Sequence, residues 1–265
     1  NIFKDINIMP SIYDKDEYNF VNKNIKLYKK LKFRIHIDTC LNRLGLVMND
    51  LLKINSYHNK IHILLSHLSS ADEGKNNYNI LQNNKFKSAI NLKINAKYNS
   101  LSNSMGIILG NNFHHDLVRP GISLYGGHFN TKMKQIIKPV ICLKGKILQI
   151  KEISKNEFVG YNQTYKTNKK LKVAILGIGY ADGISRVLSN KGNAYFKNKT
   201  FKIIGRVSMD SITVDISKND KLIKVGDYME IINHSNGIDK IANQCNTICD
   251  EILTSISKRV KRVYI

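Results

Sequence analysis

Four clusters of polar residues in the first half of the sequence hold the side chains whose types could do chemistry. The clusters are Asp38-Thr39, Ser69–Asp72, Asn103-Ser104 and Arg119–Gly121. Carboxylate, hydroxyl, amide and guanidinium groups orient a small polar molecule when a few of them converge on it. The residue types therefore indicate a polar site, and their spacing alone leaves its chemistry open.

Short apolar runs lie beside these clusters and predict the strands that position them. The candidate strands are Ile35–Ile37, His62–Leu65, Lys97–Ser102 and Ile122–Tyr125. Helical patterns precede the first three, at Asp14–Lys30, Asn49–Asn55 and Asn76–Asn91. Strands that alternate with helices predict βα units and a parallel sheet. Because the loops after the strands of a βα barrel build its active site, the first three clusters lie where chemistry is expected, whereas the fourth leads into its strand.

The pattern changes near Lys138, where strand-like segments separated by turn signals predict a mostly β second domain. The predicted strands are Val140–Ile150, Lys172–Ile178, Asn193–Phe196, Phe201–Ile204, Ile212–Val214 and Tyr228–Ile232. Two predicted helices follow, at Gly237–Cys245 and Cys249–Ile256. We therefore expect one domain over residues 1–132 and a second over residues 133–265.

Composition limits the class of protein. An apolar fraction of 42% is enough for a buried core, and no apolar run approaches the roughly 20 residues that cross a bilayer. The 42 Lys and Arg against 20 Asp and Glu give a net charge of +22, which raises a nucleic-acid hypothesis. The basic residues are scattered, without an RNP-like aromatic pattern or Cys/His finger spacing. We therefore expect a solvated basic surface, with neither nucleic acid nor membrane as a partner.

The four cysteines indicate neither a disulfide framework nor a metal site. Cys40, Cys142, Cys245 and Cys249 form no CxxC pair. Cys245 and Cys249 lie beside a predicted helix, at a spacing that more often serves packing. We expect no metal and a reducing, cytoplasmic environment.

Four stretches, in order, carry a resemblance to a known family. They read HIDTCLNRLG at 36–45, SHLSSAD at 66–72, NS at 103–104 followed by DLVRPGISLYG at 116–126, and GYADG at 179–183 with GRVSMD at 205–210. Each is weak alone. Together, within a similarity that runs from about residue 8 to 265, the chain resembles the pyridoxal-phosphate-dependent alanine racemases. The resemblance implies an α/β fold, a (β/α)8 TIM-type barrel followed by a mostly β domain.

On this resemblance the first half corresponds to about strands 4 to 8 of the barrel, so residues 1–132 form an incomplete barrel that binds the cofactor. Ile8–Ile12 matches the fourth strand. The first three strands and the stretch with the cofactor-binding lysine have no counterpart, and nothing near Lys4 resembles it. That lysine is also one of the two bases that racemisation needs on opposite faces of the α-carbon. We therefore expect the 265 residues by themselves to be inactive, and an added upstream segment to restore activity.

The resemblance also implies which residues bind pyridoxal phosphate. Arg119 faces the pyridine nitrogen, where a permanently charged guanidinium gives that nitrogen no proton. Ser104 and the backbone N–H groups of Gly121 and Ile122 bind the phosphate, and His67 completes the set. From the sequence alone, Arg119 is equally a loop arginine paired with a carboxylate, and Ser104 part of a helix N-cap.

For the substrate, the resemblance makes Tyr161 the residue that exchanges a proton on one face of the α-carbon. Arg43 and the backbone N–H of Met209 face the substrate carboxylate, and Tyr180 lies at the site entrance. The sequence alone leaves other roles open: Tyr161 as a half-buried strand tyrosine, Arg43 as a surface arginine and Met209 as a core residue.

Three residues depart from the family pattern. His36 stands where many members have a lysine, Cys40 replaces a glycine, and Asp250 replaces a tyrosine that touches the cofactor phosphate. A histidine brings no fixed negative charge, and a carboxylate repels a phosphate unless it turns away. These departures bear on cofactor affinity.

The implied function is interconversion of L- and D-alanine, which supplies D-alanine for peptidoglycan synthesis. The resemblance implies a homodimer with shared active sites, because Tyr161, Tyr180 and Met209 lie in the second domain while His67 and Arg119 lie in the first. Within one chain the two sets should then be too far apart to touch one ligand. The alternatives are a racemase of another small amino acid, such as serine, and a non-catalytic partial gene product.

Overall fold

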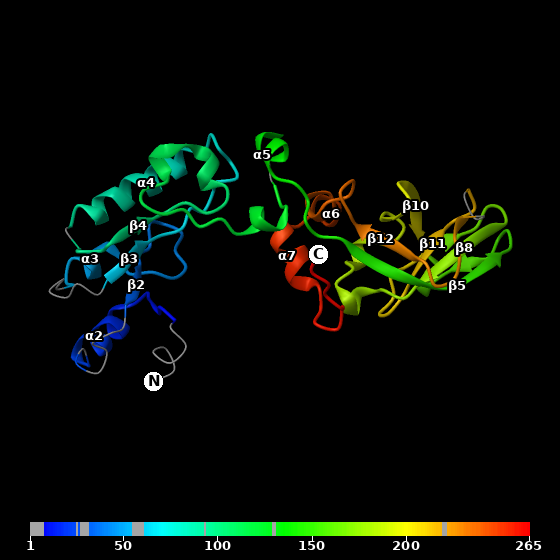
Figure 1. The fold of residues 1–265 in the computed structure, drawn as a ribbon, viewed down its shortest axis with the longest axis horizontal. Helices are drawn as coiled ribbons and strands as arrows, with labels where there is room; N and C mark the ends of the chain where they lie inside the picture. The colour runs from blue at the N-terminus through cyan, green and yellow to red at the C-terminus, as the bar shows by residue number, and fades with distance from the viewer. Residues whose placement is uncertain are drawn as a thin grey trace. The chain divides into compact units, whose positions relative to one another are not determined.

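The computed structural model describes residues 8–24, 26, 32–54, 61–92, 94–128, 131–218 and 222–265 (Figure 1). The chain forms two compact units, an N-terminal unit of Asn1–Gly121 and a C-terminal unit of Ile122–Ile265. The sequence-based division into domains of residues 1–132 and 133–265 remains a prediction.

A four-stranded parallel sheet forms the centre of the N-terminal unit. Its strands, in spatial order, are β1 (Ser11–Ile12), β2 (Phe33–His36), β3 (Ile61–Leu65) and β4 (Tyr98–Ser100). Ile12 pairs with Ile35, and Ile35 with Leu64. Ile35 and Leu64 are fully buried, as expected of a sheet covered on both faces. The predicted parallel order is confirmed for these strands.

Three helices of the N-terminal unit occupy the predicted intervals, with different bounds. They are α2 (Lys15–Lys23), α3 (Met48–Leu51) and α4 (Asn77–Ile90). The Asp14 side chain caps α2 by accepting the N–H of Glu17 at 2.8 Å, and Glu17 accepts the N–H of Tyr13 at 3.2 Å. This reciprocal arrangement satisfies N–H groups that a helix start leaves unpaired. The far ends of the two helices predicted at Asp14–Lys30 and Asn49–Asn55 fall partly outside the described residues.

The strand predicted at Ile122–Tyr125 is wrong, because these residues form the 3-10 helix η3. The place beside β4 is taken by the segment just before them. Leu117 forms a parallel bridge with Ser100, and the Arg119 N–H donates to the Ser102 carbonyl at 2.9 Å. Among the described residues Ile122–Tyr125 pairs with no strand, so its backbone bonds close locally. The fourth polar cluster therefore follows the paired segment instead of leading into a strand.

A closed six-stranded barrel forms most of the C-terminal unit, in the order β10-β11-β8-β5-β12-β9. Its strands are β5 (Leu143–Ile153), β8 (Leu171–Leu176), β9 (Asn193–Phe196), β10 (Lys199–Ile204), β11 (Ile212–Asp215) and β12 (Tyr228–Ile232). Their pairings are antiparallel, as for the long β5 against β12 in Figure 1. The mostly β prediction is confirmed for this unit. Its closure, which leaves no unpaired sheet edge, was not predicted.

Smaller elements complete the C-terminal unit. The strands β6 (Phe158–Val159) and β7 (Tyr165–Lys166) form a hairpin, and the helices are α5 (Thr131–Ile136), α6 (Ile238–Cys245) and α7 (Cys249–Ser255). The last two match the predicted helices to within one residue at each end. None of the described helices is long and apolar enough to cross a bilayer.

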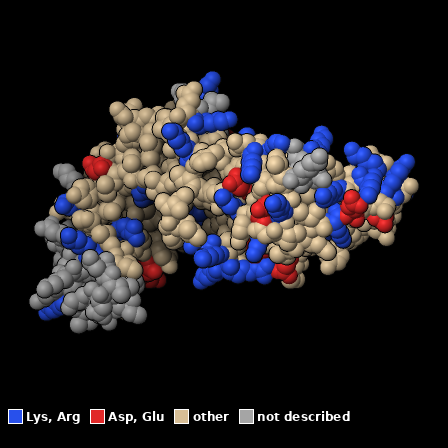
Figure 2. All heavy atoms as spheres, turned by 45° about the vertical axis from the view of Figure 1, so that its right-hand side comes forward, with Lys and Arg blue, Asp and Glu red and all other residues tan. Residues whose placement is uncertain are grey.

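Lys and Arg side chains are spread over the face of the molecule drawn in Figure 2, with Asp and Glu between them. Two lysines of the C-terminal unit have ionic partners. Lys144 lies 3.3 Å from Glu230, and Lys170 lies 2.6 Å from Glu152. Part of the positive charge is thus paired with carboxylates.

Phe86 of α4 provides a test of the N-terminal core. Its side chain is 0% exposed, and its ring packs edge to face against the ring of His115, with 4.9 Å between the ring centroids. Phe86→Ala should lower the free energy of unfolding by about 3 kcal/mol, because apolar area and ring contacts are lost and a cavity is left. Phe20 of α2, 59% exposed, is the matched control. Urea unfolding followed by circular dichroism measures both, and equal effects of the two changes would contradict this packing.

Candidate active site

Polar side chains gather where the parallel strands of the N-terminal unit end. His36 is the last residue of β2, Ser66 and His67 follow β3, and Ser100 is the last residue of β4. Parallel strands have their carboxyl ends at one edge of the sheet, where α/β proteins bind ligands. Arg119 reaches the same edge through the segment paired with β4.

The guanidinium of Arg119 ties two strand ends together. One terminal nitrogen donates to the Ser100 hydroxyl. The other donates to the Ser66 carbonyl at 2.5 Å and to the Leu101 carbonyl at 3.4 Å. None of these partners is a carboxylate, so the alternative of an ion-paired loop arginine does not hold. The group is a largely desolvated cation fixed by neutral oxygens.

Burial and neighbouring cations shift the protonation of this cluster. Burial, and secondarily Arg34, lowers the pKa of Arg119 to about 10, which leaves it charged near neutral pH. Burial, followed by the charges of Arg119, Arg43 and His36, lowers the pKa of His67 to about 4. The pKa of His36 is also lowered, by burial first and then by Arg119 and Arg43. The cluster thus combines charged arginines with neutral imidazoles.

The hydrogen bonds of His67 agree with a neutral ring. Its Nε2 lies 3.4 Å from Nδ2 of Asn103. Asn103 uses its Oδ1 to accept the N–H of Gly106 at 2.9 Å, so its amide nitrogen faces the imidazole. An amide nitrogen only donates, which makes the Nε2 of His67 the acceptor. Gly106 begins η1 (Gly106–Leu109), whose N-cap residue is Met105, so neither Asn103 nor Ser104 is the N-cap residue that the sequence alone allowed.

A buried amide holds the loop after β3. Gln82 of α4 is 0% exposed. Its Nε2 donates to the His67 carbonyl at 3.1 Å, and its Oε1 accepts the Ser69 N–H at 2.9 Å. Thr39 and Ser66 extend this network with a hydroxyl pair at 2.7 Å. Gln82 was not predicted, because a glutamine within a helical pattern gives no signal that it faces inward.

Arg43 lies at the tip of a tight loop between β2 and α3. The loop is closed by main-chain bonds from Asp38 N–H to the Leu46 carbonyl (2.9 Å) and from Leu46 N–H to the His36 carbonyl (2.8 Å). The Asp38 carboxylate accepts two further backbone N–H groups inside it. Arg43 itself is exposed, so its charge is available to a ligand.

Ser104 and Gly121 meet directly in the N-terminal unit. The Gly121 N–H donates to the Ser104 hydroxyl at 2.8 Å. Ser104 is buried, whereas a side chain added at Gly121 would meet nothing within 4 Å. The pair forms a small, open-sided polar cradle. Ile122, whose N–H was predicted to join it, begins the C-terminal unit, where its side chain packs against the barrel core.

Tyr161 is held in a loop of the C-terminal unit with unusual backbone angles. It begins η4 (Tyr161–Gln163), follows Gly160 at φ 75°, and is 65% exposed. Its exposure excludes the alternative of a half-buried strand tyrosine. Asn190 clamps this loop: its Nδ2 lies 3.2 Å from the Thr164 hydroxyl, and its Oδ1 accepts the Gly205 N–H at 2.6 Å. Asn190 thus joins the end of the Tyr161 loop, at Thr164, to Gly205.

Tyr180 and Met209 lie on two segments of the C-terminal unit that touch through their backbones. The Tyr180 N–H donates to the Ser208 carbonyl and the Ala181 N–H to the Met209 carbonyl, both at 3.0 Å. The side chains of Tyr180 and Met209 are 45% and 53% exposed. Met209 is therefore not the core residue that the sequence alone allowed.

Comparisons with known proteins cover both units. Residues 2–128 match the family described as alanine racemase, N-terminal domain, and residues 140–264 match alanine racemase, C-terminal domain. The alanine racemase of Rickettsia akari is 35% identical over 285 aligned positions, which cover 98% of this chain and 78% of that protein. The chain belongs to the alanine racemase family.

Other members of the family agree. The alanine racemase of Brucella abortus is 38% identical over 91% of this chain, and the chain spans 65% of the length of that relative. The crystal structure of the Bartonella henselae alanine racemase, described with covalently bound pyridoxal phosphate, matches with a TM-score of 0.89 at 36% identity. The match covers 100% of this chain and 75% of the Bartonella chain. The fold is thus that of the family, a TIM-type barrel domain followed by a β domain.

The predicted site residues fall into two groups, one in each unit. His67, Arg119 and Arg43 interact electrostatically, and Ser104 meets Gly121. In the other unit Tyr180 and Met209 are adjacent through their segments. Ser100 was missed because it lies inside the predicted strand Lys97–Ser102, whereas the observed β4 ends at it.

The structure shows the conformation or position of the three residues that depart from the expected family pattern. Cys40 has φ 82°, a conformation that costs little for the glycine that the resemblance leads us to expect and more for a cysteine. His36 is the last residue of β2, and the pKa of its ring is lowered. Asp250 is exposed in the first turn of α7, where the helix dipole favours a carboxylate.

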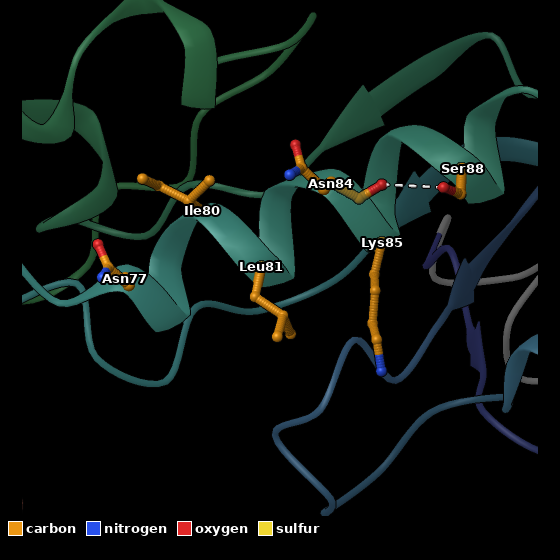
Figure 3. Close-up of a pocket in the computed structure, with 6 residues that line it drawn as sticks. All are labelled: Asn77, Ile80, Leu81, Asn84, Lys85 and Ser88. Atoms are coloured by element: carbon orange, nitrogen blue, oxygen red, sulfur yellow. Dashed lines mark hydrogen bonds between the residues drawn. The ribbon is translucent and has the colours of Figure 1, made fainter.

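A shallow groove runs along the outer face of α4 (Figure 3). It is lined by Asn77, Ile80, Leu81, Asn84, Lys85 and Ser88. The Ser88 hydroxyl donates to the Asn84 carbonyl within the same helix. Side chains along one helix face bring no charges together, so we place the chemistry at the strand ends.

The pKa of His67 predicts how stability responds to pH. The folded chain protonates this ring near pH 4, and the unfolded chain near pH 6.5. Between these values the unfolded state binds the extra proton. Stability is therefore unaffected by this group above pH 6.5 and falls by up to about 3 kcal/mol as pH drops towards 4. His67→Gln should lose less stability between pH 7 and 5 in urea unfolding. The same change at exposed His234 is the control, and identical losses in all three proteins would refute the assignment.

Proposed function

We propose that the full-length protein racemises alanine with pyridoxal phosphate and so supplies D-alanine for peptidoglycan synthesis. The observation that carries the proposal is the charged guanidinium of Arg119, fixed by neutral oxygens beside the neutral ring of His67. The Bartonella relative with bound pyridoxal phosphate supports it.

The residues present suit pyridoxal phosphate. The cradle of Ser104 and Gly121 is open on one side, since a side chain at Gly121 would meet nothing within 4 Å. A hydroxyl and adjacent backbone N–H groups, with that of Ile122 next in sequence, suit a phosphate. Arg119 would face the pyridine nitrogen, with His67 beside it. Pyridoxal phosphate, when bound, supplies an electron sink that acidifies the α-hydrogen of an amino acid.

Residues of both units would act on the substrate. Arg43 and the backbone N–H of Met209 would bind the carboxylate, and Tyr180 would line the entrance. The Tyr161 hydroxyl would move a proton to and from one face of the α-carbon. A base on the opposite face must take or return the other proton, and the resemblance assigns that role to the cofactor lysine. The inactivity of the 265 residues by themselves remains a prediction.

Tyr161→Phe tests the proposed base in the full-length protein. With pyridoxal phosphate and L-alanine, the parent should form D-alanine, and the variant should lose at least about a hundredfold in kcat because one proton transfer has no acceptor. Tyr165→Phe, in the same segment and partly buried, should keep nearly full activity. Chiral chromatography measures the product. No D-alanine from the parent would overturn the proposed function, and full activity of Tyr161→Phe would overturn the role of its hydroxyl.

The alternatives receive no support from the comparisons. The relatives are named alanine racemases, and none of those reported above is named a serine racemase or a non-catalytic protein. A parallel assay with L-serine settles the specificity of the same preparation.

We also propose a homodimer in which the N-terminal unit of one subunit and the C-terminal unit of the other form each site. Tyr161→Phe and Arg119→Gln should each be inactive. Co-expressed, they should regain about a quarter of the parent activity, because half of the dimers are mixed and one of the two sites in each is intact. Two separately tagged copies of Tyr161→Phe, both changed in the C-terminal unit, should show no such gain. Activity that stays at the level of the single variants would mean that each site lies within one chain.

A further inference from the structure

Two backbone segments of the C-terminal unit are in unusually close contact. One is the turn Gly179–Gly183, with η5 (Tyr180–Asp182), and the other is the loop Gly205–Asp210. A Cβ atom at Gly179 would lie 2.3 Å from the carbonyl oxygens of Ser208 and Met209. Only glycine fits there, and the contact lets the N–H groups of Tyr180 and Ala181 reach those two oxygens at 3.0 Å.

This contact sets the direction of the Met209 N–H. The Ser208 carbonyl and the Met209 N–H belong to one peptide group, which is planar and trans. In such a group the N–H points opposite to the C=O. Because the carbonyl points at Tyr180 N–H, the Met209 N–H is aimed away from the turn. Movement of the turn against the loop would therefore re-aim the group that the proposed function assigns to the substrate carboxylate.

One side chain joins the turn to the loop. Arg259, in the segment after α7, donates from Nε to Asp182 Oδ1 at 2.7 Å and from Nη2 to Asp182 Oδ2 at 3.2 Å. The same Nη2 lies 2.5 Å from Oδ1 of Asp210, the residue next to Met209. Asp182 also accepts the Gly179 N–H at 2.8 Å. The planar guanidinium thus bridges a carboxylate of the turn and a carboxylate of the loop.

Electrostatics favour this bridge. Asp182 is 8% exposed, and burial alone would raise its pKa. The hydrogen bonds from Arg259 and from the Gly179 N–H outweigh burial, so the pKa of Asp182 is lowered. A buried carboxylate that keeps its charge needs donors of this kind. The pKa of Arg259 is raised by both carboxylates.

We propose that Arg259 is a positioning residue for substrate binding, which acts through Asp182 and Asp210 to aim the Met209 N–H. The proposal rests on the proposed function, since it assumes that this N–H binds the substrate carboxylate. Arg259 itself touches no substrate. Its loss should therefore raise KM for alanine more than it lowers kcat, because the proton-transfer groups lie elsewhere.

Arg259→Gln in the full-length protein is the main variant, and Arg262→Gln is its matched control. Both arginines are exposed and three residues apart, but Arg262 donates to the carbonyls of Ile256, Ser257 and Val260. Arg259→Lys keeps the positive charge but lacks the planar guanidinium that bonds both carboxylates. It should therefore restore the parent KM in part. Asp210→Asn removes one exposed carboxylate and leaves Asp182 paired, which keeps the test usable if Arg259→Gln unfolds.

Two measurements are made on each variant. Hydrogen exchange at the amides of Tyr180 and Ala181 reports whether the turn stays on the loop. Steady-state kinetics report KM and kcat for L-alanine. Arg259→Gln should exchange about tenfold faster and have a KM about tenfold higher, with kcat changed less than about threefold. Asp210→Asn should change in the same direction by less, and Arg262→Gln should match the parent.

Unchanged exchange in both Arg259→Gln and Asp210→Asn would overturn the bridge. Faster exchange with an unchanged KM would overturn the positioning role. A parent protein that forms no D-alanine would overturn the proposed function and the substrate role together. The exchange rates would still decide, in that case, whether Arg259 holds the turn against the loop.

Discussion

The partly buried, hydrogen-bonded guanidinium of Arg119 is the interaction on which the site of the N-terminal unit depends. A desolvated cation is costly unless its N–H groups are bonded. The Ser66 and Leu101 carbonyls lie just past the ends of β3 and β4, and the Ser100 hydroxyl adds a third oxygen. Parallel strands end at one edge, so these oxygens are close enough to share one guanidinium. The cation in turn helps to keep His67 neutral.

The C-terminal unit positions its functional groups by a different means. Its contacts are mainly between backbones, as where the Tyr180 N–H meets the Ser208 carbonyl. Ion pairs add to these contacts where Arg259 bonds the carboxylates of Asp182 and Asp210. The first unit thus fixes a cation with neutral oxygens, and the second fixes a backbone N–H with ion pairs. Both arrangements preorganise groups before a ligand arrives.

Much of the fold followed from local patterns, and the failures share a cause. β9 and β12 have their predicted bounds, and α4 begins and ends within one residue of its prediction. Ile122–Tyr125 alternates apolar and polar residues like a strand, yet the preceding segment already pairs with β4. Alternation reports that a segment could pair. It does not report whether a neighbouring edge is available.

The sequence by itself determined the apolar runs, the turns and the ordered motifs, and through them the family, the parallel sheet of the first half and the identity of the polar groups. Only the tertiary structure decided that six strands close into a barrel, that Gln82 faces inward and that Arg259 reaches Asp182 across 77 residues. The physical reason is that periodicity and turn chemistry act between near neighbours. Bonds between distant groups form only where packing brings a donor and an acceptor to the same place.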